Sequence, residues 1–243
     1  MIFKVFNELF RQYEGLHVGI LVASNINNTG NDDKIFHLLE EIEGLLYTEF
    51  SGDDMDKKKL PAGKPKAKLI STWRAAYRDF GVEPHEYHTV LEGLLKTVLK
   101  GHKLPRINKL VDCCNFLSLK YMIPVSATDM DKIEGDIFLG KAVGEEDFTN
   151  PGTGMVEKPE QGEVIYSDAA KVLYRRWNWL ENEHVQVTEN TQNAVVFVDG
   201  LPPFDKEQVE NVLKEAKKLI QMFCSGSIQT GIATTTHNVV KIS

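Results

Sequence analysis

The spacing of apolar residues changes near Pro124, and this change constrains the fold more than any other feature of the chain. Before Pro124, apolar residues recur every three or four positions, which predicts amphipathic helices beginning near Ile35, Leu69, Val90 and Ile107. After Pro124, short β-branched or aromatic stretches alternate with turn residues, which predicts strands. Segregated helices and strands indicate an α+β fold rather than regular βαβ winding, with the helices packed on one side of mixed or antiparallel sheets.

Two N-terminal segments extend this pattern. Residues 1–15 predict an amphipathic helix, and the apolar run His17 to Ser24 predicts a buried strand. Residues 51–67 are polar, with Gly, Pro and a lysine run, and predict a flexible loop. We therefore expect an N-terminal α/β extension over residues 1–66, packed on a main domain over residues 67–243. Near the C-terminus, Asp205 and Gln208 predict a capping box at the start of a helix.

Charge is distributed unevenly along the chain. The net charge is -7, which argues against a purely electrostatic nucleic-acid binder and against DNA as the partner. Residues 57–109 nevertheless hold 13 Lys and Arg against 4 Asp and Glu, while the remainder holds 15 against 31. Solvated helix faces and a footprint for an RNA backbone both explain this asymmetry. The candidate phosphate contacts are Lys57, Lys58, Lys59, Lys64, Lys66 and Lys68.

Motifs for several classes of site are missing from the sequence. There is no Gly-x-Ser-x-Gly, no Walker phosphate loop and no His-Glu-x-x-His, so we predict neither a cofactor nor a metal. The three cysteines have no Cys-x-x-Cys spacing, and a reducing, cytoplasmic setting is the default expectation. No apolar run approaches the roughly 20 residues that span a bilayer, so we expect no membrane partner.

Two segments predict a binding site. Residues 104–135 join a buried helix to a loop containing Ser126, Thr128 and Asp129, whose small polar side chains suit a pocket floor. Turn chemistry explains the same residues, because Asp and Ser also hydrogen-bond their own backbone. Residues 173–180 (LYRRWNWL) predict a strand with Tyr174, Arg176 and Asn178 on one face and Arg175, Trp177 and Trp179 on the other. Such residues stack a base or hold a phosphate, or they form an aromatic core strand with arginines reaching solvent.

These segments resemble the B3/B4 domain of the beta subunit of phenylalanyl-tRNA synthetase. The B3-like stretch has Val111, Asp112 and Asn115 in a helix, then a Pro-bearing turn at Pro124. It continues as an Asp-x-Asp-x-Ile-x-Gly run, Asp129 to Gly135. GEVIYSDAAKVL, with Asp168, resembles the B4 strand, and TENTQNAVVFV resembles the family's Glu-Thr-x-Asn approach to a strand, here ending at Asn193. The RRWNW segment resembles free-standing members of the family.

The resemblance implies a domain that hydrolyses tyrosine wrongly attached to phenylalanine tRNA, in a pocket between two lobes. Asn115 matches a pocket Asn, whereas Ser126 stands where the family has a His and Phe197 where it has a Glu. Both departures remove groups that recognise the tyrosine hydroxyl or place water. No catalytic residue is assigned. The predicted pocket residues are Asn115, Ser126, Thr128, Asp129, Arg175, Arg176, Trp177, Asn193 and Phe197.

Three hypotheses about function follow from the sequence. The first is a free-standing editing hydrolase acting on aminoacylated tRNA and its small amino-acid moiety. The second is a non-catalytic module that binds tRNA or amino acids. The third is a small-molecule binder or enzyme on the same fold, because a fold does not determine a function. The basic segment favours the first two hypotheses, and the acidic remainder favours the third.

Overall fold

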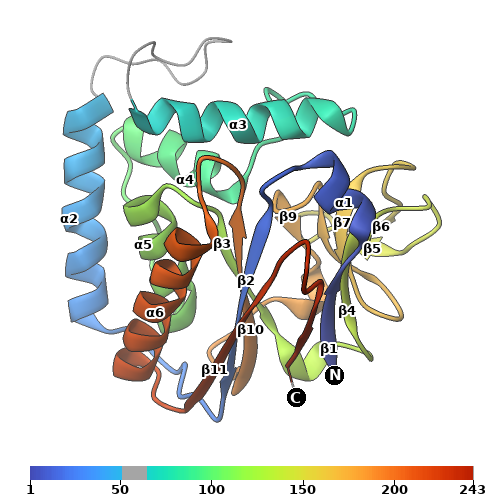
Figure 1. Cartoon of the computed structure of the whole chain (residues 1–243). Coiled ribbons are helices and arrows are strands. Elements are labelled where there is room, and N and C mark those ends of the chain that lie inside the picture. Colours follow the sequence, from blue (N-terminus) through green and yellow to red (C-terminus); the bar gives the residue numbers. More distant parts are fainter. Residues whose placement is uncertain (51–64, 243) are drawn as a thin grey trace.

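A four-stranded antiparallel sheet lies at the centre of the molecule, and both of its faces are covered (Figure 1). The structure is a computed structural model that describes residues 1–50 and 65–242. The strand order is β11 (Ser227–Ala233), β2 (His17–Ser24), β10 (Asn193–Gly200) and β3 (Val125–Asp129). Leu21 and Ala23 of β2 pack into one hydrophobic core, whereas Val18, Ile20 and Val22 pack into the other. This two-sided burial explains why β2 has an almost continuous apolar sequence.

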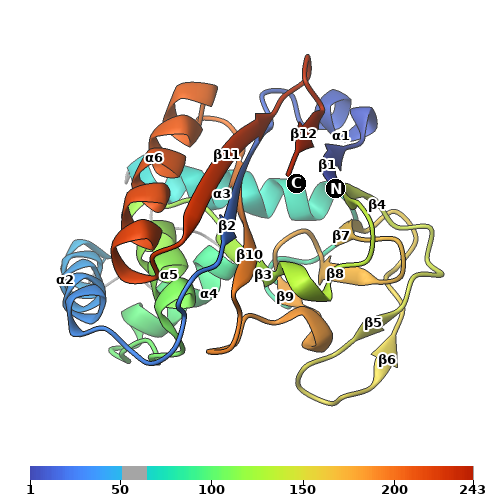
Figure 2. The same cartoon turned by 90° about the horizontal axis from the view of Figure 1, so that it is seen from below.

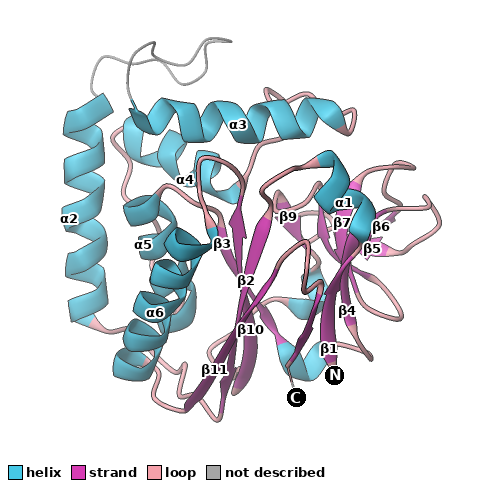
Figure 3. Cartoon of the chain, in the orientation of Figure 1, coloured by secondary structure: helices cyan, strands magenta, loops and turns pink. Residues whose placement is uncertain are grey.

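Helices cover one face of the central sheet (Figure 3). A further helix, α3, runs across one end of the layers (Figure 1). Side chains cap the starts of α5 (Lys109–Tyr121) and α6 (Lys206–Phe223): Asn108 accepts from Val111 N, and Asp205 and Gln208 form the predicted capping box. Helices packed on one side of the sheets are therefore confirmed. The helices are α1 (Asn7–Gln12), α2 (Asp33–Phe50), α3 (Pro65–Asp79), α4 (Val90–Leu99), α5 (Lys109–Tyr121) and α6 (Lys206–Phe223), with short 3-10 turns η1 (Met130–Lys132) and η2 (Glu183–Val185).

A second, mixed sheet covers the other face (Figure 2). Its strand order is β12, β1, β4, β7, β8 and β9, and only the β1–β4 pair among these is parallel. A two-stranded sheet, β5 with β6, stands apart from it. The α+β fold with mixed and antiparallel sheets is thus confirmed. The remaining strands are β1 (Ile2–Val5), β4 (Ile137–Lys141), β5 (Phe148–Thr149), β6 (Val156–Glu157), β7 (Val164–Ser167), β8 (Val172–Arg175), β9 (Leu180–Glu181) and β12 (Val239–Lys241).

The N-terminal segment differs from its prediction. Residues 2–5 are strand β1 rather than the start of a helix, because β4 and β12 pair with them on both sides. Only residues 7–12 are helical. Strand β1 belongs to the mixed sheet and β2 to the central sheet, so the N-terminal segment is part of both sheets. The predicted division at residue 66 remains a proposal about folding units, and the predicted loop at 51–67 lies mostly outside the described residues.

The segment RRWNW is not the continuous strand that its sequence predicts. Strand β8 ends at Arg175, and residues 176–179 form the turn that leads into β9. Arg176 and Trp177 both have positive φ, at 47° and 65°. The alternation of faces therefore stops at Arg175. After β9, residues 183–185 form the short turn η2.

Phe197 of β10 provides a test of the core between the sheets. It is fully buried and lies 4.5 Å from the Tyr166 ring and 5.9 Å from the Phe3 ring, measured between centroids. Phe197→Ala should lower the free energy of unfolding by about 3–5 kcal/mol, because it removes a large side chain from a packed core. The exposed Val143→Ala should change it by about 0.5 kcal/mol or less. Urea melts of both variants test this, and equal effects would contradict the layer arrangement.

Candidate functional site

A cavity of about 150 Å³ lies at the edge strand β3, where α4 and α5 approach the β8–β9 hairpin. Val125, Ser126 and Ala127 of β3 all line it. Successive strand residues point to opposite faces, so a cavity that touches three in a row must face the edge of the strand. The lining is completed by Val90, Val111, Cys114, Asn115, Tyr174, Asn178, Trp179 and Glu181.

The size and walls of this cavity suit one amino-acid side chain. Cavities of about 150 Å³ lined by apolar side chains take up benzene, so a six-membered ring sets the upper limit. Val90 and Val111 supply apolar surface on the helix side, and the Trp179 ring supplies it on the hairpin side. Asn115, at the same wall as Val111, is only 8% exposed and presents an amide that donates and accepts hydrogen bonds.

A chain of hydrogen bonds connects the Glu181 carboxyl to the backbone of β3. Thr128 Oγ1 lies 2.9 Å from Glu181 Oε1 and 3.2 Å from the Tyr174 hydroxyl. The Tyr174 hydroxyl donates to the Ala127 carbonyl oxygen at 2.8 Å. Thr128 has one proton and donates it to the Glu181 carboxylate or to Tyr174. When Glu181 is protonated, it donates to Thr128. Thr128 then donates to Tyr174, and Tyr174 donates to the Ala127 carbonyl oxygen.

Burial raises the pKa of Glu181 to about 8, although hydrogen bonds from Thr128 and Tyr174 and the charge of Lys132 oppose the rise. The carboxyl is therefore mostly protonated at pH 7 and changes charge just above it. A carboxyl with such a pKa in a cavity is suited to proton transfer or to donating a hydrogen bond. The neighbouring Cys114 thiol has its pKa raised by burial, so it stays protonated and is a poor nucleophile.

The amide of Asn178 is oriented by groups behind the cavity. Its Nδ2 donates to Asp199 Oδ2 at 3.0 Å, and its Oδ1 accepts from the Tyr77 hydroxyl at 3.1 Å. Asp199 also accepts from the Tyr166 hydroxyl at 2.5 Å, and burial raises the pKa of Asp199 to about 6. With one amide proton used by Asp199, the second proton of Nδ2 is left for the cavity.

Two of the predicted pocket residues, Asn115 and Ser126, line this cavity together, and Thr128 lies directly behind it. Asp129 lies further along β3, where it caps η1 and accepts from the Thr191 hydroxyl at 2.7 Å. Asn193 donates to Asp131. For Asp129 and Asn193 the contacts are those expected of turn chemistry.

The other four predicted pocket residues do not line the cavity. Phe197 and Trp177 are fully buried in the aromatic core between the sheets. Arg175 pairs with Glu163 at 2.8 Å and with Glu157 at 3.0 Å. Arg176 stacks on the Trp179 ring, which is itself part of the cavity wall. Arg175, the last residue of β8, and Trp177, in the turn that follows, thus lie outside the lining of this cavity.

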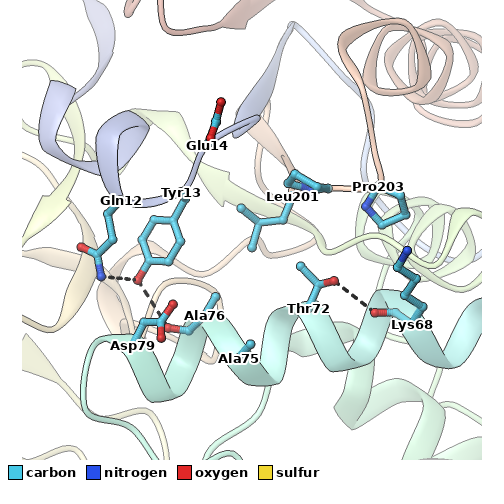
Figure 4. A pocket seen from close by; sticks show the side chains of 11 residues that line it. Gln12, Tyr13, Glu14, Lys68, Thr72, Ala75, Ala76, Asp79, Leu201 and Pro203 are labelled. Carbon is cyan, nitrogen blue, oxygen red and sulfur yellow. Dashed lines mark hydrogen bonds between the residues drawn. The ribbon is translucent and has the colours of Figure 1, made fainter. Parts of the chain in front are cut away.

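Neither Lys66 nor Lys68, the two predicted lysine contacts that the structure describes, lines the cavity. Lys66 pairs with Glu49 at 2.5 Å, and Lys57, Lys58, Lys59 and Lys64 lie outside the described residues. Lys68 lies at a second hollow of about 370 Å³, where α3 approaches the turn after α1 and residues 201–203 (Figure 4). Inside this hollow, the Tyr13 hydroxyl donates to the Ala76 carbonyl oxygen at 3.4 Å.

The second hollow has ionisable and hydroxyl side chains of its own. Glu14 and Asp79 are its carboxylates, and Figure 4 shows Glu14 and Asp79 from opposite elements of the rim.

Within residues 1–50 and 65–242, no three His, Cys, Asp or Glu side chains gather as a metal site. The helices described there include none that is both long and apolar enough to cross a bilayer. The cavity at β3 is the better candidate site because it combines the amides of Asn115 and Asn178 with the Glu181 carboxyl, whose pKa burial raises to about 8.

Comparison with known proteins identifies the family of this chain. The family model of the B3/4 domain matches residues 72–225, which include α5, β3 and the β8–β9 hairpin. The chain belongs to the B3/4 domain family. The resemblance found in the sequence is thereby confirmed.

Two relatives of the chain come from phenylalanyl-tRNA synthetases. The phenylalanine–tRNA ligase beta subunit of Fusobacterium nucleatum is 30% identical over 126 residues, which are 51% of this chain and 15% of that subunit. An N-terminal fragment of the phenylalanyl-tRNA synthetase beta subunit from Pyrococcus horikoshii covers 93% of this chain and 49% of its own, at 14% identity and a TM-score of 0.42. The chain thus spans a small part of the Fusobacterium subunit that it matches.

Beyond Asn115 and Ser126, no lining residue was predicted as a pocket residue, and the unpredicted ones on the hairpin are Tyr174, Asn178, Trp179 and Glu181. All four belong to the β8–β9 hairpin, which the sequence predicts as a single strand followed by a loop. Glu181 alone carried a usable signal, since an acidic residue directly follows an aromatic strand pattern. A turn signal was lacking because Arg176 and Trp177 occupy positions that Gly or Asn normally takes.

The raised pKa of Glu181 predicts a pH dependence of stability. Between about pH 4.5 and 8 the folded state keeps a proton that the unfolded state releases. The free energy of unfolding should therefore fall as pH rises, by at most about 1.4 kcal/mol per pH unit from this group. Glu181→Gln has no such proton, so its stability relative to wild type should increase from pH 6 to pH 8. Asp199, with a pKa of about 6, contributes little in that window.

Urea melts at pH 6, 7 and 8 measure this difference. Glu41→Gln, at an exposed position on α2, is the matched control and should follow the wild type at every pH. A constant difference between Glu181→Gln and wild type across the window would show that Glu181 is ionised throughout it.

Proposed function

We propose that this chain binds the aminoacyl end of a tRNA in the cavity at β3 and hydrolyses the ester that joins the amino acid to the RNA. The observation that carries the proposal is an amino-acid-sized cavity containing Glu181, whose pKa lies near the working pH. Membership of the B3/4 domain family supports an RNA-linked substrate. Aminoacyl-tRNA also fits a cytoplasmic location, in which the free thiols of all three cysteines stay reduced.

Glu181 offers a replacement for the carboxyl that is absent at position 197. Phe197 lies directly across from Ser126 in the β10–β3 ladder, so both side chains point to the same face of the sheet. Tyr174 contacts the Phe197 ring, with 6.3 Å between centroids, and also belongs to the hydrogen-bond chain of Glu181. A carboxyl from β9 therefore reaches the neighbourhood where a glutamate at position 197 would lie.

The proposed chemistry is general base catalysis of ester hydrolysis. Ionised Glu181 takes a proton from a water molecule, whose oxygen attacks the ester carbonyl carbon. The carbon–oxygen bond to the ribose breaks, and the proton is passed to the ribose oxygen. The amino acid and the intact RNA are then released. The amides of Asn115 and Asn178 are the available donors for the carbonyl oxygen.

Selectivity in this cavity should depend on size more than on a hydroxyl group. The volume of about 150 Å³ admits small side chains and, at its limit, a single ring. Ser126 and Phe197 replace the two groups that the resemblance associates with tyrosine. An apolar site rejects an added hydroxyl only weakly, whereas a site built to bond it discriminates by about 10⁴ or more. We therefore expect little preference between Tyr and Phe esters.

A non-catalytic binding module is the second candidate, and the protonated state of Glu181 favours it. At pH 7 this carboxyl is mainly a hydrogen-bond donor, which suits holding an amino acid rather than activating water. Binding of aminoacyl-tRNA without release of the amino acid would support this candidate.

Hydrolysis assays with tRNA charged with Ala, Phe or Tyr test the proposal. Wild type should release the amino acid faster as pH rises toward 8, and Glu181→Gln should lower the rate by about 10²–10⁴. Asn115→Ala should also lower it, because the amide orients the ester. Glu41→Gln serves as the control with unchanged activity. Full activity in Glu181→Gln would remove that residue from the mechanism, and a strong Tyr preference would contradict the specificity argument.

The lysines of the basic segment remain the proposed contacts with the RNA backbone. Replacing Lys57, Lys58, Lys59, Lys64, Lys66 and Lys68 by Ala should weaken binding about equally for different RNA sequences and flatten the dependence of affinity on salt. The control replaces Lys206, Lys214 and Lys217, which line a separate groove between α6 and β11. Titrations at several salt concentrations measure both slopes. An unchanged slope in the first variant would exclude the segment.

A further inference from the structure

The turn between β8 and β9 holds two consecutive non-glycine residues in the left-handed region. The φ angles are 47° at Arg176 and 65° at Trp177. Such residues are strained and persist only where the surroundings hold them. Arg176 N donates to Glu163 Oε1 at 2.8 Å, and Trp177 N donates to the Val164 carbonyl oxygen at 2.5 Å. The Trp177 ring is fully buried, 5.0 Å from both the Tyr13 and the Trp73 rings.

In this conformation the side chains of Arg176 and Trp177 pack against different groups. While Trp177 enters the aromatic core, the Arg176 guanidinium lies over the Tyr87 ring at 3.6 Å and over the Trp179 ring at 4.5 Å. The Tyr87 and Trp179 rings meet edge to face, with 4.8 Å between centroids. Because Trp179 also lines the cavity at β3, the guanidinium lies just behind the cavity wall.

Arg176 is nine-tenths buried, with 9% of its surface exposed, and its charge has no direct counter-ion among the described residues. The two nearest carboxylates are already bonded to its neighbour: Glu163 and Glu157 bind the Arg175 guanidinium. In the described part of the chain, the Arg176 guanidinium makes only stacking contacts. Burial and the charge of Arg175 accordingly lower the pKa of Arg176.

Stacking leaves the bonding capacity of this guanidinium unused. Aromatic faces attract the flat faces of the cation, most strongly when it is desolvated. The N–H groups lie at the edge of the guanidinium plane, in a fork that matches two oxygens of a carboxylate or phosphate. A buried cation that keeps its donors free gains most from a ligand with two anionic oxygens.

We propose that Arg176, held between Tyr87 and Trp179, is an anion subsite that binds a pair of anionic oxygens on the ligand whose other end fills the cavity at β3. This inference rests on the proposed function. In an aminoacyl-tRNA the anion is the phosphate of the terminal nucleotide, and in a free amino acid it is the carboxylate. The strained turn is what presents both the guanidinium and the cavity residues Asn178 and Trp179.

Four probes separate the two sources of the anion. The first pair is a non-hydrolysable phenylalanyl-amide analogue of 3′-aminoacyl-adenosine, with and without a 5′-phosphate. The second pair is phenylalanine and phenylalaninamide, which lacks the carboxylate. Calorimetric titration of wild type should show a preference of about tenfold or more for the anionic member of one pair. A preference in the first pair identifies a phosphate subsite, and a preference in the second identifies a carboxylate subsite.

Arg176→Gln should abolish the preference, and Arg176→Lys should retain only part of it because an ammonium lacks the fork. Arg78→Gln removes an exposed arginine from α3 and should retain the full preference. Thermal melts confirm that each variant is folded, and the wild-type comparison stands even if a variant is not. Equal binding within both pairs, or a preference that survives in folded Arg176→Gln, overturns the subsite.

The same titrations distinguish failure of the subsite from failure of the proposed function. If both adenosine analogues bind equally well to wild type and phenylalanine binds no better than phenylalaninamide, the subsite is wrong and the aminoacyl-ester function stands. If only phenylalanine binds, and Arg176→Gln abolishes that binding, the subsite stands and the aminoacyl-ester function is wrong. If no probe binds, both are overturned.

Discussion

The carboxylate of Asp199 connects the layers of this fold. It lies on β10 of the central sheet and accepts from Tyr166 of the second sheet and from Asn178 of the β8–β9 turn. Asn178 in turn accepts from Tyr77 on α3, so one buried acid joins four segments that are distant in sequence. Leaving such a group without its partners costs several kcal/mol, which makes the relative position of these layers a requirement rather than a preference.

The β8–β9 turn depends on this network and on the aromatic core. Locally, a left-handed Arg176 followed by a left-handed Trp177 is unfavourable. Burial of the Trp177 ring and the bonds of Asn178 to Asp199 and Tyr77 more than offset that cost. Tertiary contacts thus override local preference at the turn that carries two of the cavity's lining residues, Asn178 and Trp179. Local conflict of this kind is expected at functional positions.

The sequence predicted the elements whose pattern is local. The helices α2 to α6 and the strand β2 have clear periodicity, and the Asp205 capping box was correctly identified. Strand β1 was missed because its pairing with β4 and β12 is a long-range property. The turn at Arg176 was missed for the same reason, since its sequence contains no Gly, Asn or Pro at the left-handed positions. Because the turn was missed, the sequence could not show that Arg175 and Trp177 lie outside the lining of the cavity at β3.

For the cavity, matched sequence motifs identified lining residues only where those motifs lie on its walls. Asn115 on α5 and Ser126 on β3 were proposed from matched motifs, and both line the cavity. The carboxyl could not be found in that way, because position 197 holds a Phe that packs against Phe3 and Tyr166.

Glu181 approaches from β9 instead, through a hairpin whose register pairs Tyr174 with Glu181 and so places both beside Thr128. A charge-accepting group in a cavity is defined by its surroundings, by the burial that raises its pKa and by the hydrogen bonds that orient it. Which strand supplies the group matters less than these surroundings. A carboxyl therefore lies in the cavity while the residue at position 197 is part of the core.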